Sequence, residues 1–205
     1  MGLTSLFLEV KNKNVFILGT GEVATRRANR FLDKGANVIL AGNHISKELT
    51  DKGAVLRSLE NLDELVDWSD IIIIASGDKK LSDYVSSISE GKLINRADLP
   101  SEGNLIVPTT FLIGDIEVSL YTGGKSPLMA KELRKKIQST ITQRDILEIE
   151  LQDYGRSLLK SKISNQKDRK EKLYEILNDE KINSLLDECK IEEAKILVKG
   201  LIDKI

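Results

Sequence analysis

Residues 14–24 read NVFILGTGEVA. The first five form a short, mainly apolar run with β-branched Val15 and Ile17, which is typical of a buried parallel strand, and the strand ends at Gly19. From Glu22 to Lys34 the apolar side chains recur on one helical face, with arginines on the other. The sequence therefore predicts a strand, a tight turn and a helix, which together form the opening unit of an α/β fold.

The turn has the spacing Gly19-x-Gly21-x-x-Ala24. Gly19 permits the tight turn, Gly21 lets the backbone approach a pyrophosphate, and Ala24 is small enough for close packing of helix on strand. The free amides at the start of the helix suit a phosphate. This context favours dinucleotide binding, and the alternative is a tight strand–helix turn that binds nothing.

The alternation continues for about 100 residues. Helices are expected at 61–67 and 80–89, and further strands at 37–41, 55–56, 71–75 and 93–95. We therefore predict an α/β, Rossmann-like parallel sheet with helices on both faces and right-handed crossovers.

The pattern changes near residue 104. Residues 105–108 and 113–121 are expected to be extended, and the chain from Pro127 onward is helical, with a break at 165–168. The predicted organisation is a Rossmann-like domain over 1–104, a small α+β region over 105–150 and a helical C-terminal tail over 151–205.

The composition is that of a globular protein. The 205 residues are 40% hydrophobic and 31% charged, with a net charge of −1. This balance gives no electrostatic bias toward nucleic acid or membrane, and no apolar run approaches a membrane span. Cys189 and His44 are the only residues of their types, so neither a disulfide framework nor a Cys/His zinc site is expected. We expect no metal site and a reducing, cytoplasmic location.

The second strand ends in Ala41-Gly42-Asn43-His44, where many NAD-binding proteins carry an acid that binds the ribose. Asn43 can hydrogen-bond a ribose hydroxyl instead. His44 is either a cofactor contact or a solvated loop residue. This stretch has no acid that would repel the extra phosphate of NADP. Both NAD and NADP therefore stay possible cofactors.

Asp98 follows the strand at 93–95, at the sheet edge that lines the ligand crevice of open α/β folds. A carboxylate partly desolvated there would have a raised pKa and could exchange protons near neutrality. If Arg96 lies close, it would lower that pKa instead. The alternative is an ordinary turn residue in the sequence Ala-Asp-Leu-Pro.

A second glycine-rich segment reads Gly123-Gly124-Lys125-Ser126-Pro127. Ser126 is a natural helix N-cap and Pro127 a natural first helical residue. The glycines and Lys125 could form a cradle for a carboxylate or phosphate. The alternative is a capped helix with a solvated basic face.

In order and spacing, the segments 15–24, 93–100, 104–108 and 121–127 resemble the precorrin-2 dehydrogenase family, which includes the N-terminal part of siroheme synthases. The resemblance is clear over about 5–145. It implies NAD-dependent oxidation of the tetrapyrrole precorrin-2 to sirohydrochlorin, with ferrous iron insertion as a further activity of some members. It also implies a homodimer formed through 105–150.

The same resemblance assigns roles to individual residues. Asp98 falls on the family's acid/base aspartate. The positions near the NAD cofactor are Gly19, Gly21, Glu22, Val23, Asn43 and His44. The positions near the tetrapyrrole substrate are Gly123, Gly124, Lys125 and Ser126. Arg96 beside Asp98, and Tyr121 before the cradle, depart from the family pattern.

Two other functions fit parts of the sequence. An NAD-sensing regulatory module without turnover would explain residues 14–100 and leave residues 123–127 without a role. A metal-insertion protein with vestigial oxidation would act without NAD. We favour the enzyme, because two unrelated segments suit one reaction between a nucleotide and an anionic substrate.

Overall fold

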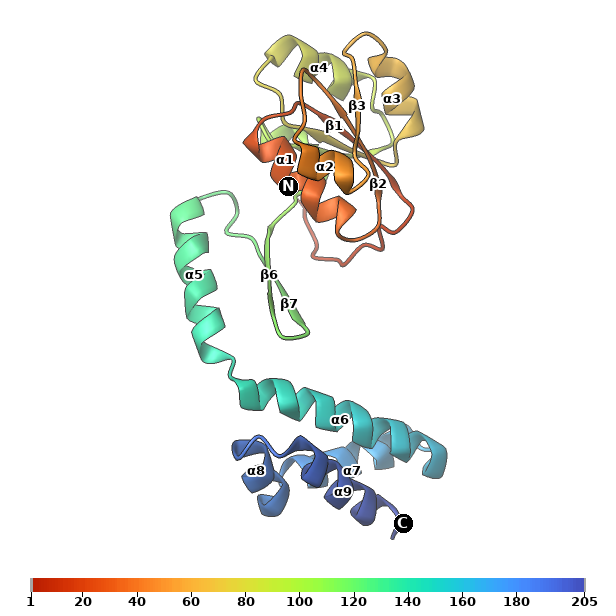
Figure 1. Cartoon of the computed structure of the whole chain (residues 1–205), viewed down its shortest axis with the longest axis vertical. Coiled ribbons are helices and arrows are strands. Elements are labelled where there is room, and N and C mark those ends of the chain that lie inside the picture. Colours follow the sequence, from red (N-terminus) through yellow and green to blue (C-terminus); the bar gives the residue numbers. More distant parts are fainter. Residues whose placement is uncertain (1, 205) are drawn as a thin grey trace. The chain divides into compact units, whose positions relative to one another are not determined.

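The computed structural model describes residues 2–204, which form two compact units that meet in sequence between Val107 and Pro108 (Figure 1). We call them the N-terminal unit and the C-terminal unit. The N-terminal unit contains a five-stranded parallel sheet. Its strands are β1 (Asn14–Leu18), β2 (Asn37–Ala41), β3 (Val55–Arg57), β4 (Ile71–Ile74) and β5 (Leu93–Arg96). Its helices are α1 (Glu22–Leu32), α2 (Lys47–Asp51), α3 (Leu62–Trp68), α4 (Lys79–Ser87) and the 3₁₀ turn η1 (Pro100–Glu102).

The strand order β3-β2-β1-β4-β5 confirms the predicted Rossmann-like sheet. β4 is four consecutive isoleucines, all buried, because successive side chains point to opposite faces and both faces are covered. Ile71 and Ile73 pack in the cluster formed with α1 and α2, whereas Ile72 and Ile74 pack in the cluster formed with α3 and α4. Helices therefore cover both faces of the sheet, as predicted.

Two expectations for the N-terminal unit need correction. The five-residue helix α2 was missed, because one turn is too short to show a helical period. Residues 105–108, which were expected to be extended, belong to no strand of either sheet. The amides of Asn104 and Leu105 both bond the carbonyl of Ile94, so the chain joins the edge of β5 irregularly, without a ladder.

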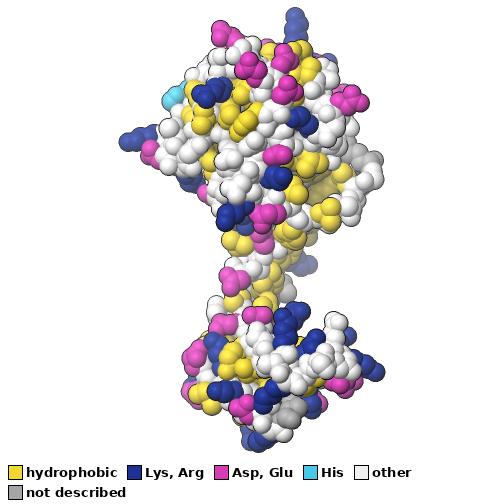
Figure 2. Space-filling model, turned by 90° about the vertical axis from the view of Figure 1, so that its right-hand side faces the viewer, with side chains coloured by type: hydrophobic (Ala, Val, Ile, Leu, Met, Phe, Trp, Pro, Cys, Tyr) yellow, Lys and Arg dark blue, Asp and Glu magenta, His cyan; other side chains and the backbone are white. Residues whose placement is uncertain are grey.

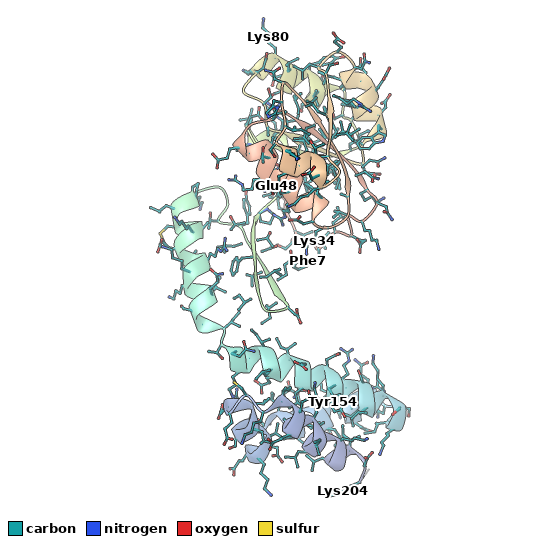
Figure 3. The ribbon with its side chains drawn as sticks, viewed as in Figure 1. Phe7, Lys34, Glu48, Lys80, Tyr154 and Lys204 are labelled. Carbon is teal, nitrogen blue, oxygen red and sulfur yellow. The ribbon has the colours of Figure 1, made fainter. Side chains whose placement is uncertain are left out.

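The C-terminal unit starts with an antiparallel hairpin and continues as helices. The hairpin consists of β6 (Thr109–Ile113) and β7 (Ile116–Leu120). The helices are α5 (Pro127–Thr140), α6 (Gln143–Lys162), α7 (Gln166–Leu177), α8 (Glu180–Asp187) and α9 (Ile191–Ile202). The last four pack around buried Leu151 and Leu159, with the half-buried Tyr154 of α6 against the same cluster (Figure 3).

The expected long helix after Pro127 is wrong in one respect, because it is two helices. Thr142 caps α6: its hydroxyl accepts from the amide of Asp145, whose carboxylate accepts from the amide of Thr142. This reciprocal capping box separates α5, which ends at Thr140, from a new helix that starts three residues later at Gln143.

Charge is mixed over the surface. The face shown in Figure 2 carries basic and acidic side chains interspersed, in line with the near-zero net charge. Among residues 2–204, no helix is long and apolar enough to cross a membrane.

Candidate active site

The candidate site lies at the carboxyl ends of β1 and β4, where the strand order reverses. Ligands of open α/β sheets bind at this switch point. Gly19 follows β1 with φ of +112°, and a Cβ there would lie 2.5 Å from the carbonyl oxygen of Ala75, which follows β4. The two loops therefore touch backbone to backbone, and only glycine fits at position 19.

The N-terminus of α1 is open. Gly21 is the N-cap and supplies no side-chain acceptor, and the first amide bonded within the helix is that of Thr25, to the carbonyl of Gly21. The amides of residues 22–24 are thus left to an external acceptor. A Cβ added at Gly21 would meet nothing within 4 Å, so an anion can approach the backbone there. This geometry fits the pyrophosphate of a dinucleotide.

The neighbouring helix shows the contrast. Asp78 caps α4, and its Oδ1 accepts from the amides of Lys80 and Leu81 at 2.9 and 3.2 Å. A carboxylate already occupies the position that an anion would take at that N-terminus. Of these two helices at the switch point, α1 is therefore the one built to receive phosphate.

Glu22 and Val23 begin α1 and both are exposed. The carboxylate of Glu22 lies 3.7 Å from Arg26 one turn later, with both side chains largely in solvent. Val23 is 38% exposed at the turn, where its apolar surface can face a bound ligand.

The loop that follows β2 packs against the same glycine turn. A Cβ at Gly42 would lie 2.7 Å from Cγ2 of Thr20, so the loops after β1 and β2 are in close contact. Asn43 and His44 follow directly and are exposed. The structure thus brings these two residues to the edge that carries Gly19 and Gly21, and their contact with a cofactor stays a prediction.

Asp98 follows β5 at the same edge, and the side chain of Arg96 forms a bidentate ion pair with it. The guanidinium donates from Nε to Oδ1 at 2.9 Å and from Nη2 to Oδ2 at 2.7 Å. Of the two opposite expectations for the pKa of Asp98, the raised value is wrong and the lowering by Arg96 is confirmed: the hydrogen bonds from Arg96 lower the pKa, outweighing the opposing effect of partial burial. In this state Asp98 is a fixed, ionised carboxylate: it has no proton to donate, and as a base it is available but weak, because its pKa is lowered.

Two further residues that contact Arg96 were not identified from the sequence. Asp83 of α4 and Glu102 of η1 each lie 3.1 Å from the guanidinium of Arg96, which is 1% exposed. A signal was available, because an arginine at the end of a parallel strand that is covered on both faces is readily buried and then needs carboxylates as partners. The sequence does not indicate which acids they are.

The segment of Gly123–Ser126 belongs to the C-terminal unit. Both glycines have positive φ, +68° and +73°, and neither amide bonds another described residue. Ser126 caps α5 as predicted, since its hydroxyl accepts from the amide of Met129 at 3.1 Å, and Pro127 begins the helix. Lys125 is exposed beside them.

No group of three or more His, Cys, Asp or Glu side chains among residues 2–204 could hold a metal ion. The acids Asp83, Asp98 and Glu102 do converge, but they converge on a guanidinium.

A Rossmann-like sheet with an open, uncapped glycine turn at its switch point defines a dinucleotide-binding protein. The model of a family described as NAD(P)-binding matches residues 6–109, about half of the chain. The chain belongs to this family, and its resemblance to precorrin-2 dehydrogenases and to the N-terminal part of siroheme synthases is confirmed.

The relatives share these names at moderate identity. A precorrin-2 dehydrogenase from Methanosarcina barkeri is 28% identical over 190 residues, which cover 86% of this chain and 84% of the relative. One from Priestia megaterium is 29% identical over 141 residues, 66% of this chain and 69% of the relative. A siroheme synthase from Actinobacillus succinogenes is 26% identical over 205 residues, 97% of this chain and 43% of that longer protein.

The solved structure titled "SirC, precorrin-2 dehydrogenase" shares the fold. It superposes with a TM-score of 0.78, covering 97% of this chain and 100% of that one, at 23% sequence identity.

Proposed function

We propose that this protein is a dehydrogenase that oxidises precorrin-2 to sirohydrochlorin with NAD. NAD, when bound, supplies the acceptor for the hydride that leaves the substrate. The chain's own residues bind the cofactor's phosphates at the open N-terminus of α1 and take up the proton that leaves with the hydride. The names of the relatives support precorrin-2 as the substrate, and the open turn at Gly21 supports a dinucleotide as the cofactor.

One observation carries the proposal. An ionised carboxylate, Asp98, lies at the same sheet edge as the uncapped helix start at Gly21. Oxidation removes one hydride and one proton from the substrate, so a base is needed beside the cofactor. A nucleotide sensor needs the turn at Gly21 and has no use for an ionised, fixed base.

The test is an anaerobic absorbance assay of the purified protein with precorrin-2 and either NAD or NADP. We expect NADH formation with matching appearance of the sirohydrochlorin spectrum. Binding of NAD without turnover would instead favour the sensing module. Adding ferrous iron to sirohydrochlorin in a separate cuvette tests iron insertion, which stays a prediction.

We infer that Gly123–Ser126 binds the carboxylates of the substrate. Precorrin-2 is a polycarboxylate, and the exposed Lys125 forms no ion pair with another described residue. The amides of the two glycines next to it are also free to donate.

The Lys125→Gln variant is expected to raise KM for precorrin-2 about 3–10-fold, because one exposed charge contact contributes about 1 kcal/mol. The value of kcat and the affinity for NAD should stay unchanged. Lys199→Gln, which removes an exposed lysine of α9, is the matched control. An unchanged KM for Lys125→Gln would remove this segment from the substrate site.

We propose further that the protein is a homodimer in a reducing, cytoplasmic environment. The two-stranded hairpin is marginal by itself, and three apolar side chains between residues 105 and 150 are exposed: Leu112 is 60% exposed, Leu128 69% and Met129 50%. Sedimentation of wild type beside Leu128→Glu tests this. The dimer mass should be lost in that variant and kept in Ile196→Glu, a control outside 105–150.

A further inference from the structure

Arg96 is the most deeply buried charged residue in the N-terminal unit. It ends β5, and its side chain is 1% exposed. Three carboxylates from three segments meet it: Asp83 of α4, Asp98 of the following loop and Glu102 of η1. A buried guanidinium is stable only when it is paired in this way.

The three contacts are unequal. Asp98 accepts from two nitrogens in a bidentate pair, whereas Asp83 and Glu102 each accept from one at 3.1 Å. The side chain of Asp98 is 24% exposed, against 49% for Asp83 and 55% for Glu102. Geometry and lower exposure both make Asp98 the strongest of the three partners.

The fold fixes the positions of Glu102 and Asp83 beside Arg96. At Gly103, a Cβ would lie 2.8 Å from the carbonyl oxygen of Ile94, so the chain after η1 passes directly against β5 and keeps Glu102 beside Arg96. Asp83 comes from α4, which begins with Lys79 and Lys80, and Lys80 extends away from the fold (Figure 3). Within the described residues, every hydrogen bond of the guanidinium goes to a carboxylate.

We propose that Arg96 is a positioning residue that holds Asp98 ionised and oriented for proton uptake, with Asp83 and Glu102 setting how tightly it is held. This inference rests on the proposed dehydrogenase function. In the reaction, precorrin-2 loses a hydride to NAD and a proton to an oxygen of Asp98, and Asp98 then passes the proton to water. Electrons and protons balance as NADH and one released proton.

The ion pair between Arg96 and Asp98 determines how the reaction rate should depend on pH. Arg96 lowers the pKa of Asp98, so the carboxylate stays ionised to a more acidic pH than an ordinary aspartate does. A base must be ionised to act, so the acidic limb of the rate profile should lie at low pH in wild type. Losing Arg96 raises the pKa of Asp98 and moves that limb to higher pH.

The test compares two variants with opposite expected shifts. Arg96→Gln should move the acidic limb of kcat to higher pH, and Arg96→Lys should restore part of the wild-type profile. The double variant Asp83→Asn/Glu102→Gln keeps Arg96 and removes two competing negative charges, so its limb should move to lower pH. This second variant keeps the test usable if Arg96→Gln does not fold.

A readout without substrate separates this inference from the proposed function. In aspartate-labelled protein, the carboxyl carbon signal that disappears in Asp98→Asn belongs to Asp98, and its titration can be followed by NMR. We expect the same opposite shifts of its midpoint in the two variants. Unmoved midpoints, or shifts in one common direction, overturn the role of Arg96. A wild type that makes no NADH yet shows these shifts overturns only the proposed function.

Discussion

The Asp98→Asn variant is expected to form NADH from precorrin-2 about 10²–10⁴-fold more slowly than wild type, since this is the usual contribution of a positioned acid or base. Asparagine has nearly the same shape and one oxygen that can still accept from Arg96. Arg96 also keeps Asp83 and Glu102, so the buried guanidinium stays paired and the fold is retained. The affinity for NAD should not change. Initial rates and a fluorescence titration with NAD measure the two effects.

Asp63→Asn is the matched control. Asp63 is an exposed carboxylate of α3 that accepts from the hydroxyl of Tyr84 at 2.6 Å, within the same unit and with no contact to Arg96. Its variant should turn over at the wild-type rate. Full turnover in Asp98→Asn would keep an enzyme and assign the proton transfer to another group.

Gly21→Val is expected to abolish detectable NAD binding while the protein stays folded. Gly21 has ordinary extended backbone angles, φ −76° and ψ −174°, and a Cβ there meets no protein atom within 4 Å. The added side chain would instead fill the space over the amides of α1, where the pyrophosphate is expected to lie. Calorimetric titration with NAD, beside a urea unfolding curve, gives both quantities.

Gly19→Ala should behave in the opposite way and lose stability. Its Cβ would lie 2.5 Å from the carbonyl oxygen of Ala75, and φ of +112° is strained for any L residue. We expect a loss of about 3 kcal/mol or more in the free energy of unfolding. Gly200→Ala, in α9 with nothing within 4 Å, is the control and should unfold no earlier than wild type.

For the earlier variant, Gly21→Val, normal NAD binding would contradict the prediction and would remove the turn from the cofactor site.

Local pattern was enough to predict the N-terminal unit. The apolar run of β1, the glycine turn and α1 were expected from the sequence and are confirmed, as is β4 with its four buried isoleucines. Such elements are visible in one dimension because a parallel strand covered on both faces must be apolar throughout. The cap of α5 at Ser126 followed from its position before Pro127 for a similar local reason.

The errors lie where distant segments decide the outcome. The sequence did not show that the run at 105–108 joins no ladder, or that the amide of Leu105 bonds the carbonyl of Ile94 in β5. The helix expected through residue 165 breaks at Thr142, where a capping box offers the backbone other partners. An apolar or helical period contains no information about these contacts.

The sequence by itself determined the class of this protein: a parallel α/β sheet, a glycine turn that is open to phosphate, and a resemblance strong enough to indicate the chemistry. These features depend on residue type and spacing along a short stretch of chain. Only the tertiary structure decided the state of Asp98. Its charge depends on a buried arginine, and the arginine's other partners, Asp83 and Glu102, come from α4 and η1. Burial and electrostatic pairing act through space, so only the folded chain decides which of the two opposite pKa shifts considered for Asp98 is found.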